Sequence, residues 1–336
     1  MSVFFLDYGL FLAKTLTLLL AVFVALAMAA GFSKRGQSNE TLRVEKLNDK
    51  FRHVRNKLAR AVVSSADAKQ LQKTQKAKAK ARQKSTSEKP RTFVLEFEGD
   101  IKASEVTNLR EEISAVLAIA NDDDEVFLRL ENPGGIVHEH GLAAAQLTRL
   151  RDRGLHLTIA VDKVAASGGY LMACVANEIV AAPFAIVGSI GVIAQLPNFN
   201  KALEEKGIEF EQITAGKHKR TVTMFGRNTD EDRAKLKSEL EDVHGLFKDA
   251  IARYRADMDL EQLATGEHWY GTRALELGLI DKLATSDDEL IRRSEDRHIF
   301  AVNYEIKQPL PEKLMGAFNG AIEKTLSTVR RGIRGI

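Results

Sequence analysis

The chain has 336 residues, of which 44% are hydrophobic, and its formal net charge is +3 at pH 7. Its single cysteine, Cys174, excludes an intrachain disulfide and a zinc site built from a cysteine cluster. Residues 34–91 hold 18 Lys and Arg against 5 Asp and Glu, whereas residues 92–336 hold 30 against 40, so a basic segment precedes an acidic body.

The first candidate element is an apolar segment near the N-terminus. Residues 15–32, TLTLLLAVFVALAMAAGF, carry no charge, and as a helix they would span about 27 Å, close to a bilayer core. A cleaved signal peptide is the alternative, because AMA at 27–29 resembles a cleavage site. The densely basic flank that follows resists translocation. We therefore expect an N-terminal tail at 1–8 and an uncleaved transmembrane anchor at 9–32.

Residues 33–91 are expected to form a basic helical linker. Its apolar residues recur at spacings of three and four, which predicts a short coiled-coil-like stripe that self-associates or lies on another surface. These residues are Val44, Leu47, Phe51, Val54, Leu58 and Ala61. The lysine-rich stretch 73–84 is typical of a solvated helix or tether, with or without contact to lipid headgroups. Nucleic acid is disfavoured as a partner, because no aromatic residues interleave the basic ones.

From residue 92 onward, strand and helix patterns alternate. Strands are predicted at 93–100, 125–135 and 155–162, with helices at 104–120 and 138–154. This alternation predicts βαβ units and a mainly parallel sheet, which is an α/β fold.

The second half of the body continues with an apolar run at 179–196. Its Pro183 and its glycines favour buried strand and loop over a second membrane span. An apolar strand is expected before the lysines of 215–220, then a long helix at 230–258, and a short helix and final strand within 268–284. Residues 306–336 form a basic tail, and its apolar residues recur at helical spacing. We expect this amphipathic tail to lie on a membrane or to pack against a neighbour.

Three glycine-bearing turns each follow a predicted strand: ENPGG at 131–135, ASGG at 166–169 and GSIG at 188–191. In a parallel sheet, turns that follow strands gather at the carboxyl edge, where sites form. Ser167 stands at a strand-to-helix junction, so it either caps the helix or acts as a nucleophile beside glycine N–H groups. The three turns together favour an acyl-transfer site.

A serine nucleophile needs a base. The eight histidines suggest no triad order, and His138 and His140 flank Glu139 without the spacing of a zinc helix motif. A lysine can serve if burial keeps it neutral. Lys217 and Lys219 in AGKHKR are candidates, although most lysines are solvated surface residues and spacing alone does not choose between the two.

Five motifs together resemble the signal peptide peptidase A (SppA) family of serine proteases, peptidase family S49, and the anchor, basic linker and single protease unit resemble its SohB branch. The motifs are ENPGG, VDKVAASGGY, GSIGVI, GKHKR and TGEHWYGTRALELGLIDKL. The resemblance covers about residues 1–305. It implies a ClpP/crotonase-like serine protease domain at 92–305 and a Ser–Lys dyad.

Carried over by motif, the resemblance implies that Ser167 is the nucleophile and Lys219 the general base. Ser189 matches the hydroxyl that orients the lysine. The backbone N–H groups of Gly134, Gly135 and Gly168 match the oxyanion hole. One departure is Asn132, which stands where the family often has serine. Because it precedes the glycines, we do not expect it to disturb the hole.

The function expected from the sequence is that of a membrane-anchored serine endopeptidase that cleaves peptides or unfolded or membrane-derived segments. The resemblance implies a single-pass protein of a bacterial inner membrane and a homo-oligomer, with no cofactor, no metal and no nucleic-acid partner. A crotonase-type acyl-CoA enzyme and a non-catalytic membrane scaffold are the alternatives. The side of the protease domain stays open: the basic linker favours the cytoplasm, whereas the resemblance suggests a protease acting across or outside the membrane.

Overall fold

A computed structural model describes residues 8–19, 40–63, 73 and 89–306. The chain divides into two compact units, and the larger, Arg43–Asn303, is called the body below. Residues 8–19 are helical. Among the described residues, no helix combines the length and apolar character needed to cross a bilayer. The rest of the predicted anchor, residues 20–32, lies outside the described residues, as does the predicted tail from residue 307.

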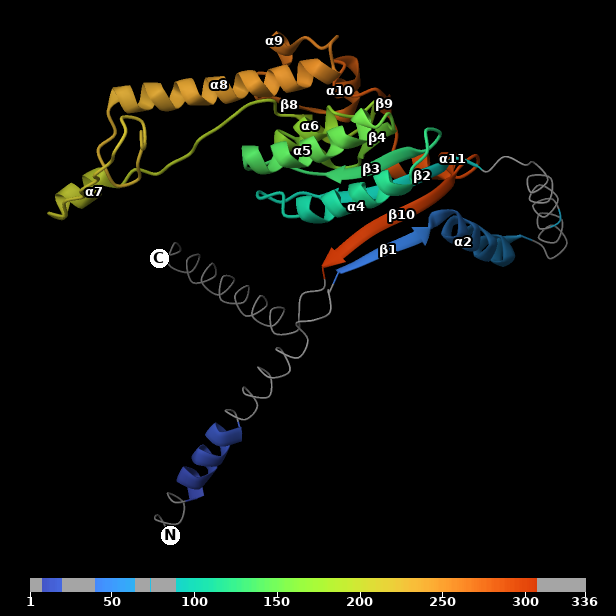
Figure 1. Cartoon of the computed structure of the whole chain (residues 1–336), viewed down its shortest axis with the longest axis horizontal. Coiled ribbons are helices and arrows are strands. Elements are labelled where there is room, and N and C mark those ends of the chain that lie inside the picture. The colour runs from blue at the N-terminus through green and yellow to red at the C-terminus, as the bar shows by residue number, and fades with distance from the viewer. Residues whose placement is uncertain (1–7, 20–39, 64–72, 74–88, 307–336) are drawn as a thin grey trace. The chain divides into compact units, whose positions relative to one another are not determined.

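A seven-stranded sheet forms the centre of the body (Figure 1). Its strands, in spatial order, are β1 (Glu40–Lys46), β10 (His298–Ile306), β2 (Arg91–Glu98), β3 (Glu125–Glu131), β4 (His156–Val161), β6 (Glu178–Ala181) and β9 (Lys282–Leu283). Every neighbouring pair from β10 to β9 is parallel. The predicted α/β fold is therefore confirmed, and the carboxyl ends of β3 and β4 lie at one edge.

The ENPGG turn follows β3 of the central sheet, and the ASGG and GSIG turns follow strands of a second sheet of three short strands. The second sheet contains β5 (Val164–Ala166), β7 (Ile186–Gly188) and β8 (His268–Tyr270), with β5 parallel and β8 antiparallel to β7. The apolar run 179–196 thus supplies β6, β7 and a following loop, as predicted, although the loop is exposed beyond residue 192. The strand predicted within 210–220 is wrong, because these residues form an exposed irregular segment.

Helices cover the two faces of the central sheet. On one face, alternate residues of β2, β3 and β4 join the main core with α4 (Val106–Ile119), α5 (Val137–Asp152), α6 (Gly168–Ala173) and part of α8 (Asp230–Tyr254). The opposite face packs against α11 (Ser286–Arg293) and α2 (Leu47–Val62). The remaining helices are α7 (Asn200–Glu205), α9 (Leu260–Leu263) and α10 (Gly271–Glu276).

The coiled-coil-like stripe of the linker is interrupted in the structure. Val44 lies in β1, and the helix begins only at Leu47, so the stripe is not one continuous helix. Leu47 and Phe51 pack against the second face of the sheet. Val54 and Leu58, farther along α2, are exposed. The first turns of the predicted linker helix are therefore part of the body, and its later turns keep an uncovered apolar side.

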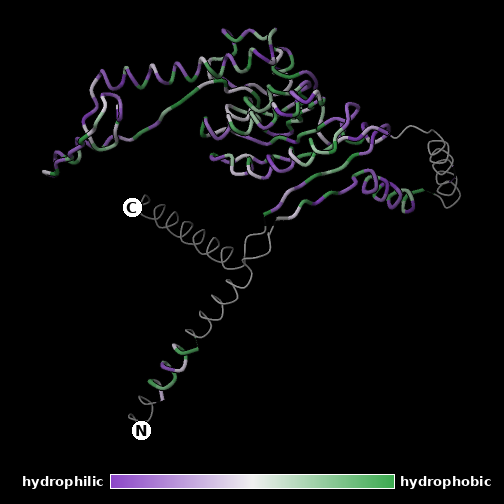
Figure 2. Tube along the Cα trace, in the orientation of Figure 1, coloured by the Kyte–Doolittle hydropathy of each residue, from purple (hydrophilic) through white to green (hydrophobic). Residues whose placement is uncertain are grey.

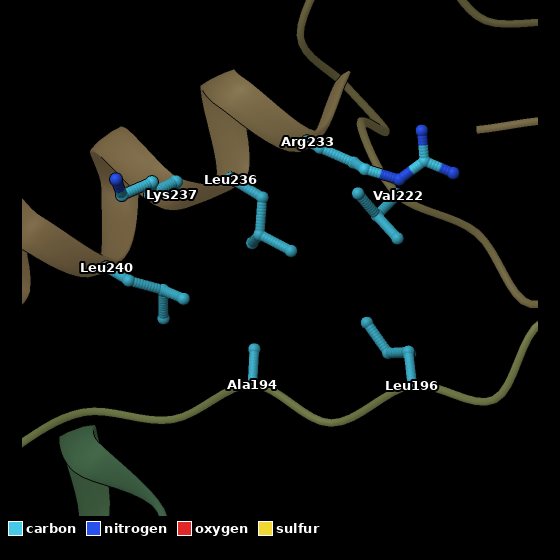
Figure 3. Close-up of a pocket in the computed structure, with 7 residues that line it drawn as sticks. All are labelled: Ala194, Leu196, Val222, Arg233, Leu236, Lys237 and Leu240. Atoms are coloured by element: carbon cyan, nitrogen blue, oxygen red, sulfur yellow. The ribbon is translucent and has the colours of Figure 1, made fainter. Parts of the chain in front are cut away.

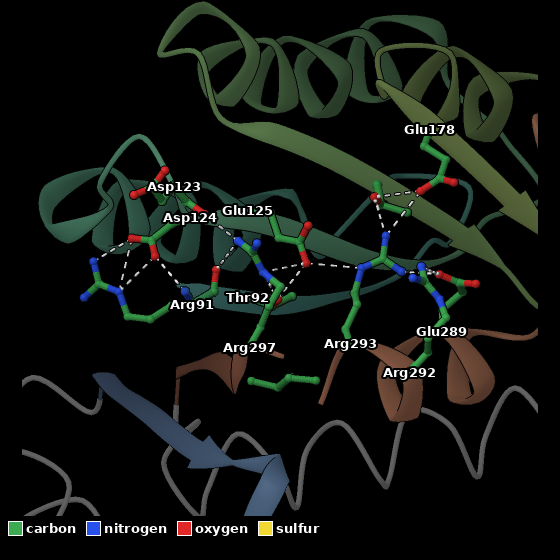
Figure 4. Close-up of polar contacts among 12 residues, drawn as sticks. Arg91, Thr92, Asp123, Asp124, Glu125, Glu178, Glu289, Arg292, Arg293 and Arg297 are labelled. Atoms are coloured by element: carbon green, nitrogen blue, oxygen red, sulfur yellow. Dashed lines mark hydrogen bonds and ion pairs between the residues drawn. The ribbon is translucent and has the colours of Figure 1, made fainter. Parts of the chain in front are cut away.

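Charged side chains fill much of the space between α11 and the sheet (Figure 4). Arg293, only 7% exposed, donates to Glu125 at 3.1 Å, to Thr158 at 3.0 Å and to Glu178 at 3.2 Å. It also pairs with Glu289, and its guanidinium lies 5.1 Å from the ring centre of Phe127. A buried cation is tolerated only when its donors are satisfied in this way.

Glu289 is the acidic partner at the centre of this cluster, and its side chain is 3% exposed. Burial alone would raise the pKa of its carboxyl. Hydrogen bonds from Arg292 and Lys282, with the charge of Arg293, outweigh burial and lower the pKa to about 2. Because the folded pKa is depressed, the stabilisation is present above the ordinary value of 4.5 and is lost as the pH falls towards 2.

We predict that Glu289→Gln lowers the free energy of unfolding by roughly 3 kcal/mol at pH 7, because it removes the buried carboxylate that Lys282, Arg292 and Arg293 share. The difference from wild type should shrink as the pH falls below about 4.5. Urea unfolding followed by the fluorescence of Trp269, the single tryptophan, measures it. Glu276→Gln, which breaks an exposed pair with Arg273, is the control and should cost under about 0.5 kcal/mol. Equal effects of the two variants would contradict the account.

Candidate active site

Ser167 occupies a strained turn between β5 and α6. Its φ is 52° and its ψ is −119°, a conformation that a residue with a side chain rarely adopts. Its backbone N–H donates to the carbonyl of Gly188 at 2.8 Å, which holds the turn against the end of β7. The side chain makes no capping hydrogen bond to α6. The simple alternative of a helix cap therefore does not account for this serine, and strain of this kind is typical of functional sites.

The ENPGG turn lies directly against Ser167. A Cβ atom on Gly134 would lie 2.8 Å from Cβ of Ser167 and 3.0 Å from the backbone nitrogen of Gly168. Gly134 also has a φ of 88°, in the region that favours glycine. Gly135 packs against the backbone of Ile101 in the same close manner. The structure thus brings together Ser167 and the glycines that the sequence placed around it.

The backbone N–H groups of the three glycines are not equivalent. The N–H of Gly134 donates to Oδ1 of Asn132 at 2.8 Å, so this donor is already engaged. The N–H groups of Gly135 and Gly168 make no hydrogen bond within the described part of the chain. Of the three predicted oxyanion donors, Gly135 and Gly168 therefore remain available for a ligand. Gly134 instead allows the ENPGG turn to approach Ser167 closely, because it has no Cβ atom.

Ser189 follows β7, beside Ser167. The parallel register pairs Ala166 with Gly188, so the two serines are the next residues of neighbouring strands. Ser189 also has a φ of 52°, and its N–H donates to the carbonyl of Glu267 at 2.6 Å. Among the described residues, Ala103, Ser167 and Ser189 are the non-glycine residues with positive φ. Two of these three strained positions are thus adjacent at the candidate site.

Lys219 lies elsewhere in the body. It is exposed in the irregular segment between α7 and α8. Its neighbour Lys217 pairs with Glu231, at the start of α8, at 2.9 Å. By contrast, α6 contacts α8, whose residues Phe247 and Ile251 join the main core. From Glu231 to Phe247 the helix rises about 24 Å, so the structure does not bring Lys219 to Ser167 within one chain.

Residues 191–229, called the α7 arm below, extend away from the rest of the body at the N-terminal end of α8 (Figure 1). The arm is held together by its own contacts, including a hydrogen bond of 2.7 Å from the N–H of Phe199 to the carbonyl of Met224 and ring contacts of Phe225 with Phe199 and Phe210. Much of the segment from β7 to α7 is hydrophobic (Figure 2). Its large apolar side chains are nevertheless exposed, Ile193 to 75%, and farther along the arm Ile213 is exposed to 94%.

A pocket of about 220 Å³ lies between the α7 arm and α8 (Figure 3). It is lined by Ala194, Leu196, Val222, Arg233, Leu236, Lys237 and Leu240. The lining offers no hydroxyl, thiol or carboxylate, and none of the predicted site residues belongs to it. The candidate active site is therefore the turn around Ser167 rather than this pocket.

Other reactive groups in the described residues offer no competing site. Cys174 is buried, and burial raises the pKa of its thiol to about 12, which keeps it protonated and unreactive. No group of three or more His, Cys, Asp and Glu side chains in the described ranges could hold a metal ion.

Sequence reasoning missed two buried polar residues behind the turn. Asn132 and His140 are both 0% exposed, and Nε2 of His140 lies 3.2 Å from Oδ1 of Asn132. A signal for His140 was present, because it shares a helical face with Ala143, Ala144 and Leu147, which all face the core. Asn132 was singled out only as a departure from the family pattern.

Comparisons with known proteins agree with the motifs. The profile described as peptidase family S49 N-terminal matches residues 3–147, and the profile of peptidase family S49 matches residues 149–299. The chain is 43% identical over 319 residues to the probable protease SohB of Haemophilus influenzae, covering 91% of this chain and 90% of that protein. It is 45% identical over 322 residues to the probable protease SohB of Buchnera aphidicola subsp. Acyrthosiphon pisum, covering 96% of each.

Among solved structures, the chain is similar to a mutant of the 1510-N membrane-bound stomatin-specific protease in complex with a substrate peptide. The TM-score is 0.42 at 13% identity, and the match covers 69% of this chain and 99% of the other.

We predict that Gly168→Ala lowers the free energy of unfolding by about 1–3 kcal/mol, because the added methyl would lie 2.5 Å from Cγ of the buried His140. Gly141→Ala in α5 is the matched control. Its methyl meets no atom within 4 Å, and replacing a helical glycine should stabilise by about 0.5–1 kcal/mol. Urea titration with Trp269 fluorescence compares them. A Gly168→Ala protein as stable as wild type would show that the turn is looser than described.

Proposed function

The chain belongs to peptidase family S49, and from this premise we propose that it is a membrane-anchored serine endopeptidase with Ser167 as nucleophile and Lys219 as general base. The observation that carries the proposal is the backbone of Ser167, strained at φ 52° and ψ −119°, followed in the chain by Gly168 and packed against Gly134. A turn of this kind presents a hydroxyl rather than burying it in a cap. The substrates we propose are peptides and unfolded or membrane-derived segments.

The proposed reaction has two halves. In the first, neutral Lys219 takes the proton of the Ser167 hydroxyl as Oγ attacks the scissile carbonyl carbon, and the protonated lysine then gives the proton to the leaving amine. The N–H groups of Gly135 and Gly168 donate to the oxyanion that forms. In the second half, Lys219 activates a water that hydrolyses the acyl-enzyme and frees Ser167. The hydroxyl of Ser189, beside Ser167, orients the lysine.

We propose that Lys219 serves Ser167 of a neighbouring subunit. A lysine acts as a base only where apolar surroundings keep it neutral, whereas Lys219 in a single chain is exposed. The rise of α8 is about 24 Å from Glu231, which pairs with the nearby Lys217, to Phe247 in the main core. A neighbour that covers the α7 arm would remove both obstacles, because it would bury Lys219 and supply a second Ser167.

The surface that supports assembly is the α7 arm itself. Its exposed apolar side chains would be buried by a second copy of the chain, and burial of apolar area is the main driving force of association. The uncovered side of α2 at Val54 and Leu58 is a second apolar surface in the body. The homo-oligomer is therefore proposed to form through the α7 arm.

The membrane part of the proposal rests on the sequence. Residues 15–32 are uncharged and long enough to cross a bilayer as a helix. We propose an anchor at 9–32, a linker at 33–91 whose β1 and first turns of α2 pack on the sheet, a protease domain at 92–305 and a lipid-facing tail at 306–336, in a bacterial inner membrane. A reporter enzyme fused after Ile336 tests the side of the protease domain. The positive charges of 34–91 favour the cytoplasm.

The two alternatives predict different chemistry. A crotonase-type acyl-CoA enzyme would not require a Ser–Lys pair, and membership of a peptidase family counts against it. A non-catalytic membrane scaffold would not react with a serine-directed fluorophosphonate, whereas the proposed peptidase would be labelled at Ser167.

We predict that Ser167→Ala and Lys219→Ala each abolish cleavage of fluorescein-labelled casein, since a nucleophile and its base act as a unit. Lys219→Arg should also be inactive, because a guanidinium stays protonated. Lys217→Ala, which only breaks an exposed pair with Glu231, is the control and should keep most of the activity. Undiminished cleavage by purified Ser167→Ala would refute Ser167 as the nucleophile. An inactive Lys217→Ala beside an active Lys219→Ala would assign the general base to Lys217 instead.

We also predict that mixing inactive Ser167→Ala with inactive Lys219→Ala protein restores part of the activity. In a mixed oligomer, an intact Ser167 and an intact Lys219 would meet at some subunit boundaries. Casein cleavage, measured after the two proteins are mixed in detergent and allowed to exchange subunits, tests this. No recovery, despite exchange verified by two fluorescent labels, would place the dyad within one subunit.

A further inference from the structure

Asn132 and His140 form a buried polar pair directly behind the candidate active site. Asn132 ends the run of β3, and His140 lies on α5, one turn after Ile136. Neither side chain is exposed to solvent. A buried pair of this kind is retained only if its hydrogen bonds are satisfied, so the partners of each atom indicate what the pair holds.

The amide of Asn132 has a defined orientation. The N–H of Gly134 can only donate, so the oxygen of the amide must face it, at 2.8 Å. The amide nitrogen then faces the sulfur of Met172 at 3.2 Å. The same amide oxygen lies 3.2 Å from Nε2 of His140. For this contact to be a hydrogen bond, Nε2 must carry a proton and donate.

The imidazole of His140 also packs against Gly168, the residue that follows Ser167. Its ring is so close to Gly168 that a Cβ atom there would lie 2.5 Å from Cγ of the histidine. Nδ1 lies 3.0 Å from the carbonyl oxygen of Ile136. With the single proton of a neutral imidazole on Nε2, Nδ1 has no proton to donate, so this contact is not a hydrogen bond and the ring is held on this side by packing. His140 therefore contacts Gly168 directly. It also contacts Asn132, which in turn holds Gly134 in the ENPGG turn.

The backbone of Asn132 fixes the nucleophile strand as well. Its N–H donates to the carbonyl of Val164 at 2.8 Å, and its carbonyl accepts from the N–H of Ala166 at 3.0 Å. One residue thus holds the Gly134–Gly135 turn with its side chain and the strand leading to Ser167 with its main chain.

We propose that Asn132 and His140 are positioning residues of the oxyanion hole: the proton on Nε2 of His140 orients the amide of Asn132, which holds Gly134 so that Gly135 and Gly168 donate to one point. This rests on the proposed function, because it assigns a task to the same site. The N–H of Gly134 does not donate to the oxyanion in this proposal. Its hydrogen bond to Oδ1 of Asn132 holds the turn in place. A shift of the turn by about 1 Å would misalign a donor and slow the reaction about 100-fold.

Two matched pairs of variants separate hydrogen bonding from packing. His140→Gln keeps an amide N–H near the position of Nε2, whereas the shorter side chain of His140→Asn reaches only to about the position of Nδ1. Asn132→Asp keeps an oxygen acceptor for Gly134, whereas Asn132→Leu has similar size and no acceptor. All four are made in the full chain in detergent, and Trp269 fluorescence selects a temperature at which each is folded.

The first measurements are kcat and KM for fluorescein-labelled casein. The second is the rate at which a fluorophosphonate labels Ser167, because the phosphoryl oxygen of this probe would occupy the oxyanion hole. We expect His140→Gln and Asn132→Asp to stay within about threefold of wild type. His140→Asn and Asn132→Leu should lose about 10- to 100-fold in kcat and in labelling rate, with KM nearly unchanged. The double variant His140→Asn with Asn132→Leu should lose no more than either alone, because the two act as a unit.

Casein binding in a Ser167→Ala background, followed by fluorescence polarisation, should be the same for all variants. Equal activities of His140→Gln and His140→Asn, or losses that appear in casein binding rather than kcat, would overturn the positioning role. The two proposals fail in different ways. An active Ser167→Ala protein would defeat the assignment of Ser167 as nucleophile, whereas an inactive one beside four indistinguishable variants would defeat only the role of the pair.

Discussion

The contact between Asn132 and the strand β5 joins the two sheets of the body, and the geometry of the site depends on it. The backbone of Asn132 bridges Ala165 in a parallel manner, at the point where β3 leaves the central sheet. Glycine is needed around this bridge: a Cβ atom on Gly99 or Gly169 would overlap the side chain or backbone of Asn132. Because the two strands meet so closely, the ENPGG turn and the turn at Ser167 are forced into contact.

The same architecture explains why one chain does not complete a Ser–Lys pair. The sheet and α6 fix Ser167 at the carboxyl edge, while a helix of 25 residues, α8, carries the α7 arm away from it. An arm with exposed isoleucine and phenylalanine side chains is an unfavourable surface in water for an isolated chain. Assembly through this arm would bury that surface and bring a lysine into apolar surroundings. Stability of the oligomer and activity of the site would then have the same physical origin.

Much of the body could be predicted from the sequence because its elements have strong local patterns. The strand predicted at 93–100 forms as β2, Arg91–Glu98. The amphipathic helix after it and the glycine turns after β3, β5 and β7 stand where periodicity and turn residues placed them. The linker was harder, because Val44 and Leu47 share a helical spacing although a strand ends between them. The long apolar run at 179–196 gave no sign that its last part would be exposed, since an apolar run by itself favours burial.

The candidate site was predictable in part. Ser167, Ser189 and the glycines follow strands that pair in the sheet, so their proximity follows from βαβ topology. The position of Lys219 does not follow from any pattern, because it lies in an exposed irregular segment that precedes α8. The pairing of Asn132 with His140 depends on the side-chain packing of β3 against α5, and periodicity could show only that His140 faces inward.

The most direct test of the central claim is a cryo-electron microscopy structure of the full chain assembled in detergent, in which the distance from Oγ of Ser167 to Nζ of each Lys219 is measured. The account predicts a hydrogen-bonding distance of about 2.6–3.2 Å between Ser167 of one subunit and Lys219 of the next, with the α7 arm buried between them. An assembly in which every Lys219 stays exposed to solvent, or in which it reaches the serine of its own subunit, would contradict the claim.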